Sequence, residues 1–342
     1  MTAAKKRVTI KDVAASAEVS YQTVSRVINN HPSVHPETRA RVQEAIEALN
    51  FRPNLAARSL PQRRSFIIGL IIPYEAEFLF RDPNLLAQIS GIDATANARD
   101  YNLLLSTAGN SDSGQEAFDR LIRNQVVDGV IVVETSGSSK GREQLARANY
   151  PYVSIGYNPG MPDAYCVHSD DRAGAYKVTR HLLAQGHQRI GVINGPLTGA
   201  VSSMEERLRG HQQALQEAGL VFDPALMVYG DYTRHSGQLA TEELLALPNP
   251  PTAIFAFNDR MAMGTIRALH AVNLKVPGDV AVVGFDDVPA ATDFNPPLTT
   301  VRQNGAEMGR VAAEILFKLI AGEPVPNHKV VLPADFIIRQ SA

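Results

Sequence analysis

The chain has 342 residues, of which 44% are hydrophobic and 20% charged, and its formal net charge is −2. This length exceeds one typical domain, and the composition is that of an ordinary soluble protein with an ample core that needs no membrane span. A single cysteine, Cys166, excludes a disulfide within the chain, and the basic residues after Met1 do not resemble a cleavable secretion signal. We therefore expect a cytoplasmic protein.

Charge is unevenly distributed along this sequence. Residues 1–64 contain eleven Lys or Arg and five Asp or Glu, a net of +6, so residues 65–342 sum to −8. A basic head on an acidic body predicts that a polyanion binds the head only.

Two short helices are predicted at the start of the chain. Thr9 is a polar cap followed three residues later by Asp12, a pattern that opens a helix. After a turn near Glu18, Ser20 is a second cap, and the apolar residues beyond it repeat at helical spacing. The outward face of the second helix consists of hydrogen-bonding side chains: Tyr21, Gln22, Ser25, Arg26 and Asn29. In a helix-turn-helix such side chains read base edges in the major groove of DNA.

The alternative for this region is a small helical bundle whose polar face is simply solvated. A solvated face is more often rich in Glu and Lys, and the basic charge of the head also favours DNA binding. A third helix is predicted from His35 onward, with Pro36 near its start and a buried stripe that includes Val42 and Leu49.

The region from Thr9 to Leu60 resembles the amino-terminal signature of the lactose-repressor/galactose-repressor family of bacterial transcription regulators. The resemblance rests on the run VSYQTVSRVIN at residues 19–29 and on LNFRPN at residues 49–54, and it continues through the chain. Glu18 departs from the family's usual Gly, and a left-handed backbone there would cost Glu about 1 kcal/mol. The resemblance implies DNA contacts from Thr9, Ser20, Tyr21, Gln22, Thr23, Ser25, Arg26, Asn29, Asn54, Ala57 and Leu60.

The segment from Asn54 to Leu60 is short, amphipathic and bounded by prolines. Seven residues cannot sustain an isolated helix in water, so helicity there needs a partner. The resemblance implies paired hinge helices in a homodimer on DNA, with Leu60 inserted between central base pairs in the minor groove. A plain flexible linker is the alternative. The predicted division is a DNA-binding domain over residues 1–52, a hinge over 53–64 and an effector domain over 65–342.

From Ser65 onward, apolar strand-like runs alternate with helix-like stretches, which predicts parallel sheets buried on both faces. The strands are expected at 66–72, 103–106, 130–133, 152–155, 190–193, 253–257 and 280–285. The helices are expected at 85–99, 114–124, 173–184, 205–218, 236–245, 261–272 and 304–320. These strands are too many for one ordinary sheet. The predicted fold class is therefore α/β, with a small all-α helix-turn-helix head and two doubly wound α/β lobes, which the resemblance likens to periplasmic sugar-binding proteins.

The resemblance implies that the chain crosses between the lobes three times, near 167–170, 297–302 and 327–330. The first lobe then spans about 65–167 and 302–327, and the second about 168–299 and 328–342. Ligands of parallel sheets bind outside the carboxyl ends of the strands, so the cleft between the lobes is the expected pocket.

Two polar residues, Asn258 and Asp286, directly follow predicted strands, a placement that suits hydrogen bonding to vicinal hydroxyls. Helix capping is the simpler interpretation of the acids Asp259 and Asp287. The resemblance implies effector contacts at Arg207, Asn258, Asp286 and Gln303.

Aromatic residues add to this expected pocket. Tyr232 falls where the resemblance places a sugar-stacking ring, although surface packing is the alternative. Phe78, Phe80 and Asp82 occupy a predicted loop after Pro73 that resembles loops of glucoside-responsive family members. At the strand end where the lactose repressor has Asp, this chain has Gly156, which argues against a galactoside effector.

Patterns of catalytic sites are missing. Adjacent acids such as Asp286 and Asp287 point in different directions, and the six-residue spacing of His181 and His187 fits no metal-binding pattern. No P-loop, nucleophile elbow or complete dinucleotide fingerprint occurs. We expect no enzyme activity, no cofactor and no metal.

The sequence favours a dimeric transcriptional repressor that binds near-palindromic double-stranded operator DNA. Its expected effector is a small molecule such as a monosaccharide, disaccharide or glucoside. A corepressor-dependent regulator of the same family stays open, because the sign of the response depends on which lobe closure favours the hinge helices. The head and the lack of a signal peptide argue against a sugar-binding transport protein. An enzyme of sugar metabolism is the remaining alternative.

Overall fold

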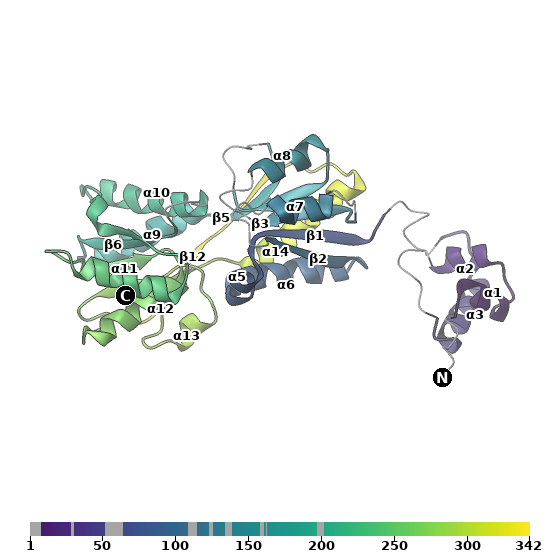
Figure 1. Cartoon of the computed structure of the whole chain (residues 1–342), viewed down its shortest axis with the longest axis horizontal. Coiled ribbons are helices and arrows are strands. Elements are labelled where there is room, and N and C mark those ends of the chain that lie inside the picture. Colours follow the sequence, from purple (N-terminus) through teal and green to yellow (C-terminus); the bar gives the residue numbers. More distant parts are fainter. Residues whose placement is uncertain are drawn as a thin grey trace. The chain divides into compact units, whose positions relative to one another are not determined.

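A computed structural model describes residues 8–28, 31–51, 64–108, 115–122, 126–133, 139–157, 161, 163–196 and 202–342, without the side chains of residues 73–75, 78, 108, 115 and 139. The chain divides into two compact units, Met1–Phe66 and Ile67–Ala342 (Figure 1). Four of the predicted DNA contacts, Asn29, Asn54, Ala57 and Leu60, lie outside the described residues. So does the side chain of Phe78.

The first unit contains three helices around a small apolar core. They are α1 (Ile10–Ser16), α2 (Tyr21–Ile28) and α3 (Pro36–Ala48). Val13, Val24 and Val42, one from each helix, are fully buried together, because the apolar residues of each helix recur on one face. The turn between α1 and α2 places Glu18 at φ 53°, the left-handed backbone anticipated where family members have Gly.

The first lobe of the second unit is a six-stranded parallel sheet in the order β11-β5-β4-β3-β1-β2. Its strands are β1 (Ile67–Glu75), β2 (Asn102–Ala108), β3 (Gly129–Val133), β4 (Tyr152–Ile155), β5 (Cys166–Ser169) and β11 (Lys329–Leu332). Its helices are α5 (Ala76–Arg81), α6 (Pro83–Asn97), α7 (Gln115–Ile122), α8 (Ser139–Arg147) and α14 (Gly305–Ala321). The pairs α6 with α14 and α7 with α8 cover opposite faces of the sheet (Figure 1).

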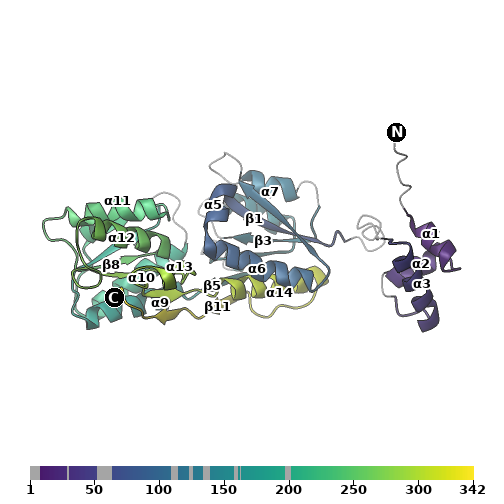
Figure 2. The same cartoon turned by 90° about the horizontal axis from the view of Figure 1, so that it is seen from below.

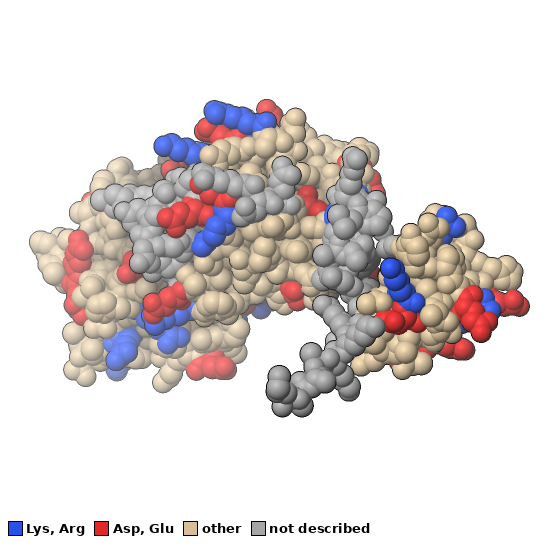
Figure 3. Space-filling model, turned by 45° about the vertical axis from the view of Figure 1, so that its right-hand side comes forward, with Lys and Arg blue, Asp and Glu red and all other residues tan. Residues whose placement is uncertain are grey.

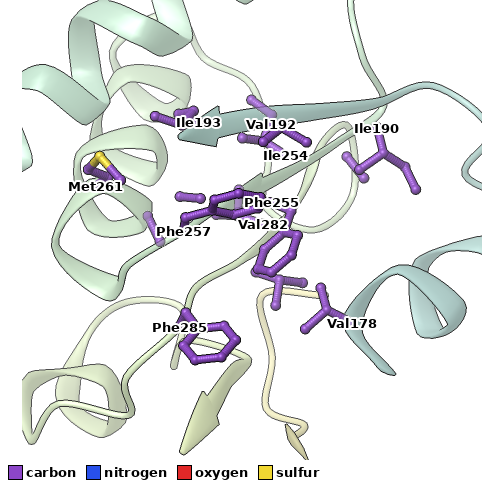
Figure 4. Close-up of a cluster of buried hydrophobic side chains, with 14 of the residues drawn as sticks. Val178, Ile190, Val192, Ile193, Ile254, Phe255, Phe257, Met261, Val282 and Phe285 are labelled. Atoms are coloured by element: carbon purple, nitrogen blue, oxygen red, sulfur yellow. The ribbon is translucent and has the colours of Figure 1, made fainter. Parts of the chain in front are cut away.

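The second lobe is a four-stranded parallel sheet in the order β7-β6-β8-β9. Its strands are β6 (Ile190–Asn194), β7 (Met227–Tyr229), β8 (Ala253–Ala256) and β9 (Ala281–Val283), and a separate antiparallel pair is formed by β10 (Thr300–Arg302) and β12 (Asp335–Ile337). Its helices are α9 (Asp171–Ala184), α10 (Ser202–Glu217), the 3-10 turn η1 (Pro224–Leu226), α11 (Arg234–Leu245), α12 (Asp259–Ala271) and α13 (Ala290–Asp293). Figure 4 shows the core of this lobe, where Phe255, Phe257 and Met261 are fully buried.

The third crossing between the lobes falls slightly later than predicted. The chain leaves the first sheet after Ser169, returns after Arg302 and leaves again after Leu332. The third crossing therefore follows β11, and the expected boundary at 327–330 is wrong. Lys329–Leu332 pairs with β5 as an edge strand of the first sheet, which puts these residues and His168–Ser169 in the first lobe. In Figure 2, β5 and β11 lie at the junction of the lobes.

The segment after β1 differs from the sequence prediction. Residues 76–81 form the helix α5, so Phe78, Phe80 and Asp82 do not lie in one loop. Asp82 is the N-cap of α6, where its carboxylate accepts hydrogen bonds from the backbone N–H groups of Asn84 at 2.9 Å and Leu85 at 3.3 Å. Within the described residues, no helix combines the length and the apolar character needed to span a bilayer.

Candidate functional site

The exposed side of α2 is the candidate DNA-reading surface. Tyr21, Gln22 and Arg26 are exposed, whereas Val24 and Val27 face the core. Ser25 is half-buried. This arrangement leaves a strip of long hydrogen-bonding side chains with their ends in solvent, as the reading of base edges requires.

Three of the predicted DNA contacts also take part in hydrogen bonds that cap helices. The Asp12 carboxylate accepts hydrogen bonds from the backbone N–H of Thr9 at 2.8 Å and from its hydroxyl at 2.7 Å. Ser20 accepts from the Thr23 backbone N–H at 3.1 Å, and the two hydroxyls lie 2.9 Å apart. Thr9, Ser20 and Thr23 therefore stabilise the helix starts whether or not they touch DNA.

The positive charge of the head lies outside its helical bundle. Residues 8–28, 31–51 and 64 contain five basic and five acidic residues, and the six other basic residues are Lys5, Lys6, Arg7, Arg52, Arg58 and Arg63. On the face shown in Figure 3, Lys and Arg side chains lie among Asp and Glu side chains in the described surface of both units. The described bundle therefore has no net positive charge, and the charge that attracts DNA belongs to the segments on either side of it.

In the second unit, a cavity that is partly open to solvent lies between the two lobes. It brings together six of the seven predicted effector residues: Asp82, Arg207, Tyr232, Asn258, Asp286 and Gln303. Gly156 also lines it. Their roles as effector contacts stay predictions, but their convergence on one cavity makes it the candidate effector site.

Arg207 on α10 is the most heavily paired residue of this cavity. Its Nε donates to Asp171 Oδ1 at 2.8 Å, its Nη1 donates to the Phe257 carbonyl oxygen, and Nη1 lies 4.0 Å from Asp286 Oδ1. The guanidinium also stacks 3.7 Å above the centre of the Phe285 ring. Only 3% of the residue is exposed, so the ion pair with Asp171 is desolvated and each charge depends on the other.

Asp286 presents its carboxyl group at the end of the second-lobe sheet. Its φ of 125° turns the chain sharply after Phe285, and Gln303 Nε2 donates to its Oδ1 at 2.7 Å. Burial raises the pKa of Asp286 well above its usual range, and the Arg207 guanidinium only partly opposes this shift. Burial likewise raises the pKa of Asp171, again opposed by Arg207.

Asn258 and Tyr232 form a second group of polar residues in the cavity. The Asn258 side chain caps α12 by accepting from the Met261 N–H at 2.8 Å, and its Nδ2 donates to the Tyr232 carbonyl oxygen at 3.2 Å. Asn258 thereby holds the loop that carries the Tyr232 ring, whose backbone has φ 66°.

The capping roles expected for Asp259 and Asp287 are wrong. Because Asn258 supplies the cap, Asp259 is free to turn inward, where it accepts from the Val288 N–H at 2.8 Å and from the Thr300 hydroxyl at 2.5 Å. Burial raises the pKa of Asp259 to about 7. Asp287 instead pairs with Arg302 at 2.7 Å and Arg339 at 2.6 Å, which ties together segments distant in sequence.

Asp82 contributes a carboxylate of the first lobe to the lining of the same cavity. Its Oδ2 lies 3.5 Å from Arg260 Nη1 on α12, and both side chains are largely buried. This ion pair joins the lobes directly across the cleft, so its geometry depends on how far the cleft is closed.

Several lining residues were not anticipated from the sequence. They are Asn84, Gln88, His168, Ser169, Asp171 and Ser203 among the polar ones. Ser169 and Asp171 flank the first crossing, and the rule that ligands bind at strand ends could have identified them. Gln88 lies within α6, where its sequence neighbours carry no such signal. Among the described residues, no group of His, Cys, Asp and Glu side chains could hold a metal ion.

Comparisons with known proteins agree with this architecture. Residues 9–54 match the family described as bacterial regulatory proteins, lacI family, and residues 179–342 match the periplasmic binding protein-like domain. The chain is 36% identical to the HTH-type transcriptional regulator CelR of Thermobifida fusca, over 98% of this chain and 99% of that protein. It is also 36% identical to catabolite control protein A of Priestia megaterium, with the same two coverages. The chain belongs to the LacI family of bacterial transcription regulators.

Solved structures of LacI-family members superpose over nearly the whole chain. A complex of the transcriptional regulator CelR with cellobiose has a TM-score of 0.75 and 35% identity, and covers 98% of this chain and 100% of that one. A lac repressor dimer bound to operator and the anti-inducer ONPF has a TM-score of 0.84 and 29% identity, with coverages of 98% and 99%. The predicted fold class and DNA-binding function are confirmed. These LacI-family relatives are transcription regulators and not enzymes.

Proposed function

We propose that this regulator is a repressor whose operator binding is controlled by a neutral saccharide bound between its lobes, and that it acts in the cytoplasm as a homodimer. The observation that carries this proposal is the convergence of Asp82 from the first lobe with Arg207, Asn258 and Asp286 from the second on one cavity. A ligand held by both walls changes the balance between open and closed lobes, because it binds the closed arrangement better.

The charges of the cavity favour a neutral ligand over an anionic one. Asp82, Asp171 and Asp286 line it, and Arg207 is already engaged by Asp171. Because Arg207 is already engaged, an additional carboxylate or phosphate would be buried there without a cation of its own, which is costly. Hydroxyl groups can donate to carboxylates and amide oxygens and accept from amide and guanidinium N–H groups, so a polyhydroxylated ligand suits this lining.

Apolar surface in the same cavity suits a sugar ring. Leu85, Ile155 and Met308 line it together with Tyr232. Sugar C–H groups can pack against such side chains while the hydroxyls reach the polar ones. The CelR structure contains cellobiose, so cellobiose is the first saccharide to test on the present chain.

Binding is coupled to lobe movement through the crossings. Asp171 begins the helix that follows the first crossing, and Gln303 lies directly after β10 on the second. A saccharide bound to Asp286 and Gln303 therefore contacts the segments about which the lobes turn. Strand β1 starts a few residues after the predicted hinge. Movement of the first lobe therefore displaces the end of the hinge segment in each copy of a dimer.

Exposed apolar side chains support association of two copies. Leu104 and Leu105 on the edge strand β2 are 38% and 39% exposed, and Phe80 and Leu86 nearby in α5 and α6 are 65% and 41% exposed. Clusters of large apolar side chains at a surface are typical of protein interfaces. A homodimer presents two recognition helices and thus requires a near-palindromic operator.

The test begins with a thermal-shift screen of neutral saccharides against the full-length protein, because a ligand of the folded state raises the melting temperature. Genomic fragments selected by the protein then supply an operator, and its affinity is measured with and without the saccharide found. Weaker operator binding with saccharide supports an inducible repressor, and stronger binding identifies a corepressor instead. No melting-temperature shift with any neutral saccharide would refute the proposed effector class.

A further inference from the structure

A second cavity, of about 660 Å³ and partly open to solvent, lies within the first lobe. Ligand pockets of proteins enclose about 300–1,000 Å³, so this cavity has room for a small molecule. Its described lining comes from α8, β4, α14 and the segments that precede β4 and β5, all of which belong to the first lobe. The described lining shares no residue with that of the interlobe cavity.

This cavity lies at the amino ends of the strands. Tyr152 is the first residue of β4, and Tyr165 directly precedes β5. The interlobe cavity is lined instead by Ile155 and Ser169, the last residues of the same two strands. Because β4 and β5 are parallel, their amino and carboxyl ends lie at opposite edges of the sheet. The two cavities are therefore separated by the length of these strands.

The wall of the second cavity is largely aromatic. Half-buried aromatic and apolar side chains line it: Tyr150, Tyr152, Tyr165, Met161 and Leu319. The Tyr150 hydroxyl donates to the Val127 carbonyl oxygen, and the Tyr165 ring packs against the His328 imidazole with 4.5 Å between centroids. These contacts hold two of the three rings in place. The face of an aromatic ring carries partial negative charge and attracts cations.

The charged groups of the described lining are both carboxylates. Glu143 and Asp163 are exposed, and no Lys, Arg or His stands among the described lining residues. Glu143 lies 3.5 Å from Arg147, but both side chains are exposed, and such ion pairs are weak in water. Arg142 opposes the rise that burial causes in the pKa of Tyr152, but it is itself buried and does not line the cavity. Carboxylates beside ring faces favour an organic cation over an anion.

We propose that this cavity is a second small-molecule site, which binds an organic cation such as a quaternary or protonated amine with an apolar body. The ring faces attract the cationic group, Glu143 and Asp163 balance its charge, and Met161 and Leu319 contact its apolar part. A cation bound there touches Tyr165 and so the start of β5, the strand that leads into the first crossing between the lobes. The site is independent of the proposed saccharide effector.

The experiment uses the full-length protein and two probes of the same shape. Choline carries a quaternary ammonium group, and 3,3-dimethylbutan-1-ol is its uncharged carbon analogue. Their affinities are measured by ligand-observed NMR titration, which detects weak complexes. Choline should bind about threefold or more tightly than the alcohol, because only the cation is attracted by ring faces and carboxylates. Equal affinities for the two probes, or no binding of either, would overturn the proposal.

Substitutions at one ring separate attraction of the cation from simple packing. Tyr165→Leu removes the ring face and should weaken choline binding about threefold to tenfold, whereas Tyr165→Phe keeps a ring face and should bind choline nearly as wild type does. Asp163→Asn keeps the shape but removes the charge, and should weaken choline binding about threefold. Asp293→Asn, an exposed change on α13, is the matched control for that charge.

Tyr232→Leu is the control for the location of the cation, because Tyr232 and three aspartates line the interlobe cavity and could also attract choline. Choline affinity should stay as in wild type in this variant. Weaker choline binding in Tyr232→Leu but not in Tyr165→Leu would place the cation between the lobes and refute the proposal. Wild-type choline affinity in both Tyr165→Leu and Asp163→Asn would refute it as well. Should Tyr165→Leu fail to fold, the exposed change Asp163→Asn decides.

Discussion

Arg26 in the head and Arg207 in the cleft carry the same guanidinium group in opposite environments, one exposed and one buried. Arg26 is exposed on α2, at one end of a strip of polar side chains that pack against nothing in the core. Arg207 is 3% exposed, bound to Asp171 at 2.8 Å and stacked on the Phe285 ring. The head thus makes its polar contacts when DNA arrives, whereas the cleft makes them on folding. Substitutions of the exposed side chains on α2 should change affinity alone, and substitutions in the cleft should change stability as well.

The largest expected effect is that of Arg207→Ala. It leaves Asp171 buried without its partner, and breaking a buried ion pair costs about 3–5 kcal/mol. We expect the free energy of unfolding of the second unit, measured by urea denaturation, to fall by about this amount, and the saccharide response to disappear. Operator binding by the folded protein should persist.

Arg209→Ala is the control for this prediction. Arg209 lies on the same helix, and its ion pairs with Glu205 and Glu206 are exposed, so its loss should cost less than about 1 kcal/mol. Equal denaturation midpoints for the two variants would show that the cleft network does not stabilise the fold.

The next effect is that of Arg26→Ala on DNA binding. A bidentate contact to a base is worth about 1–3 kcal/mol, so operator affinity should fall by that amount while affinity for random DNA changes less. The melting temperature should stay within about 1 °C of wild type, because surface substitutions rarely change stability. Arg41→Ala, exposed on α3, is the control. A specific-to-random affinity ratio equal to that of wild type would mean that α2 is not the recognition helix.

These two predictions also mark how far sequence reasoning could go. The strand Tyr152–Ile155 has the predicted bounds, and Gly129–Val133 is fully buried, because continuous apolar runs indicate central parallel strands. β11 was missed since it alternates exposed and half-buried residues at a sheet edge. α8 was missed because only three of its eight described side-chain positions are buried, so its sequence shows little apolar periodicity.

Sequence reasoning likewise predicted some of the cleft residues and missed others. Asn258 and Asp286 follow strands, so the rule that ligands bind at strand ends predicted their position correctly. Which of two adjacent polar residues caps a helix is decided by a shift of one residue, and Asn258 took the role expected of Asp259. Gln88 was not predicted, since a polar residue inside a helix shows nothing of the cavity formed by distant segments.

The dependence of stability on pH gives a further test of the buried groups in the second unit. Asp259 has its folded pKa raised to about 7, so the folded state binds an extra proton between its ordinary pKa and 7. Its contribution is therefore complete at low pH and is lost as pH rises through 7, by about 1 kcal/mol between pH 6 and 8. His211 has its pKa lowered to about 4 by burial, so its effect has the opposite sign, extends up to its ordinary pKa of 6.5, and offsets part of the decline just above pH 6. The melting temperature should fall from pH 6 to 8.

Asp259→Asn should make that decline less steep, since it removes one titrating group while keeping a similar shape, whereas Asp171 and Asp286, whose pKa values burial also raises, still titrate. Asp293→Asn, an exposed change on α13, should leave the decline as in wild type. A decline of equal slope in Asp259→Asn would contradict the assignment to Asp259.

The smallest expected effect is that of Ser20→Ala in the head. Loss of the cap that accepts from the Thr23 N–H should destabilise α2 by about 1 kcal/mol. Backbone amide hydrogen exchange in α2 should become about fivefold faster, with no change in the second unit. Ser16→Ala at the end of α1 is the control. Unchanged exchange would leave Ser20 with a role in DNA contact alone.

The central claim is that the exposed face of α2 and the buried cleft act on one equilibrium. The most direct measurement is the calorimetric affinity of the saccharide found by screening, determined for the full-length protein with and without saturating operator DNA. Coupling is reciprocal, so the saccharide must bind more weakly to the operator complex by the same factor by which it weakens operator binding. We predict a factor of about 5–150, the range typical of allosteric proteins. Equal saccharide affinities with and without operator would contradict the account.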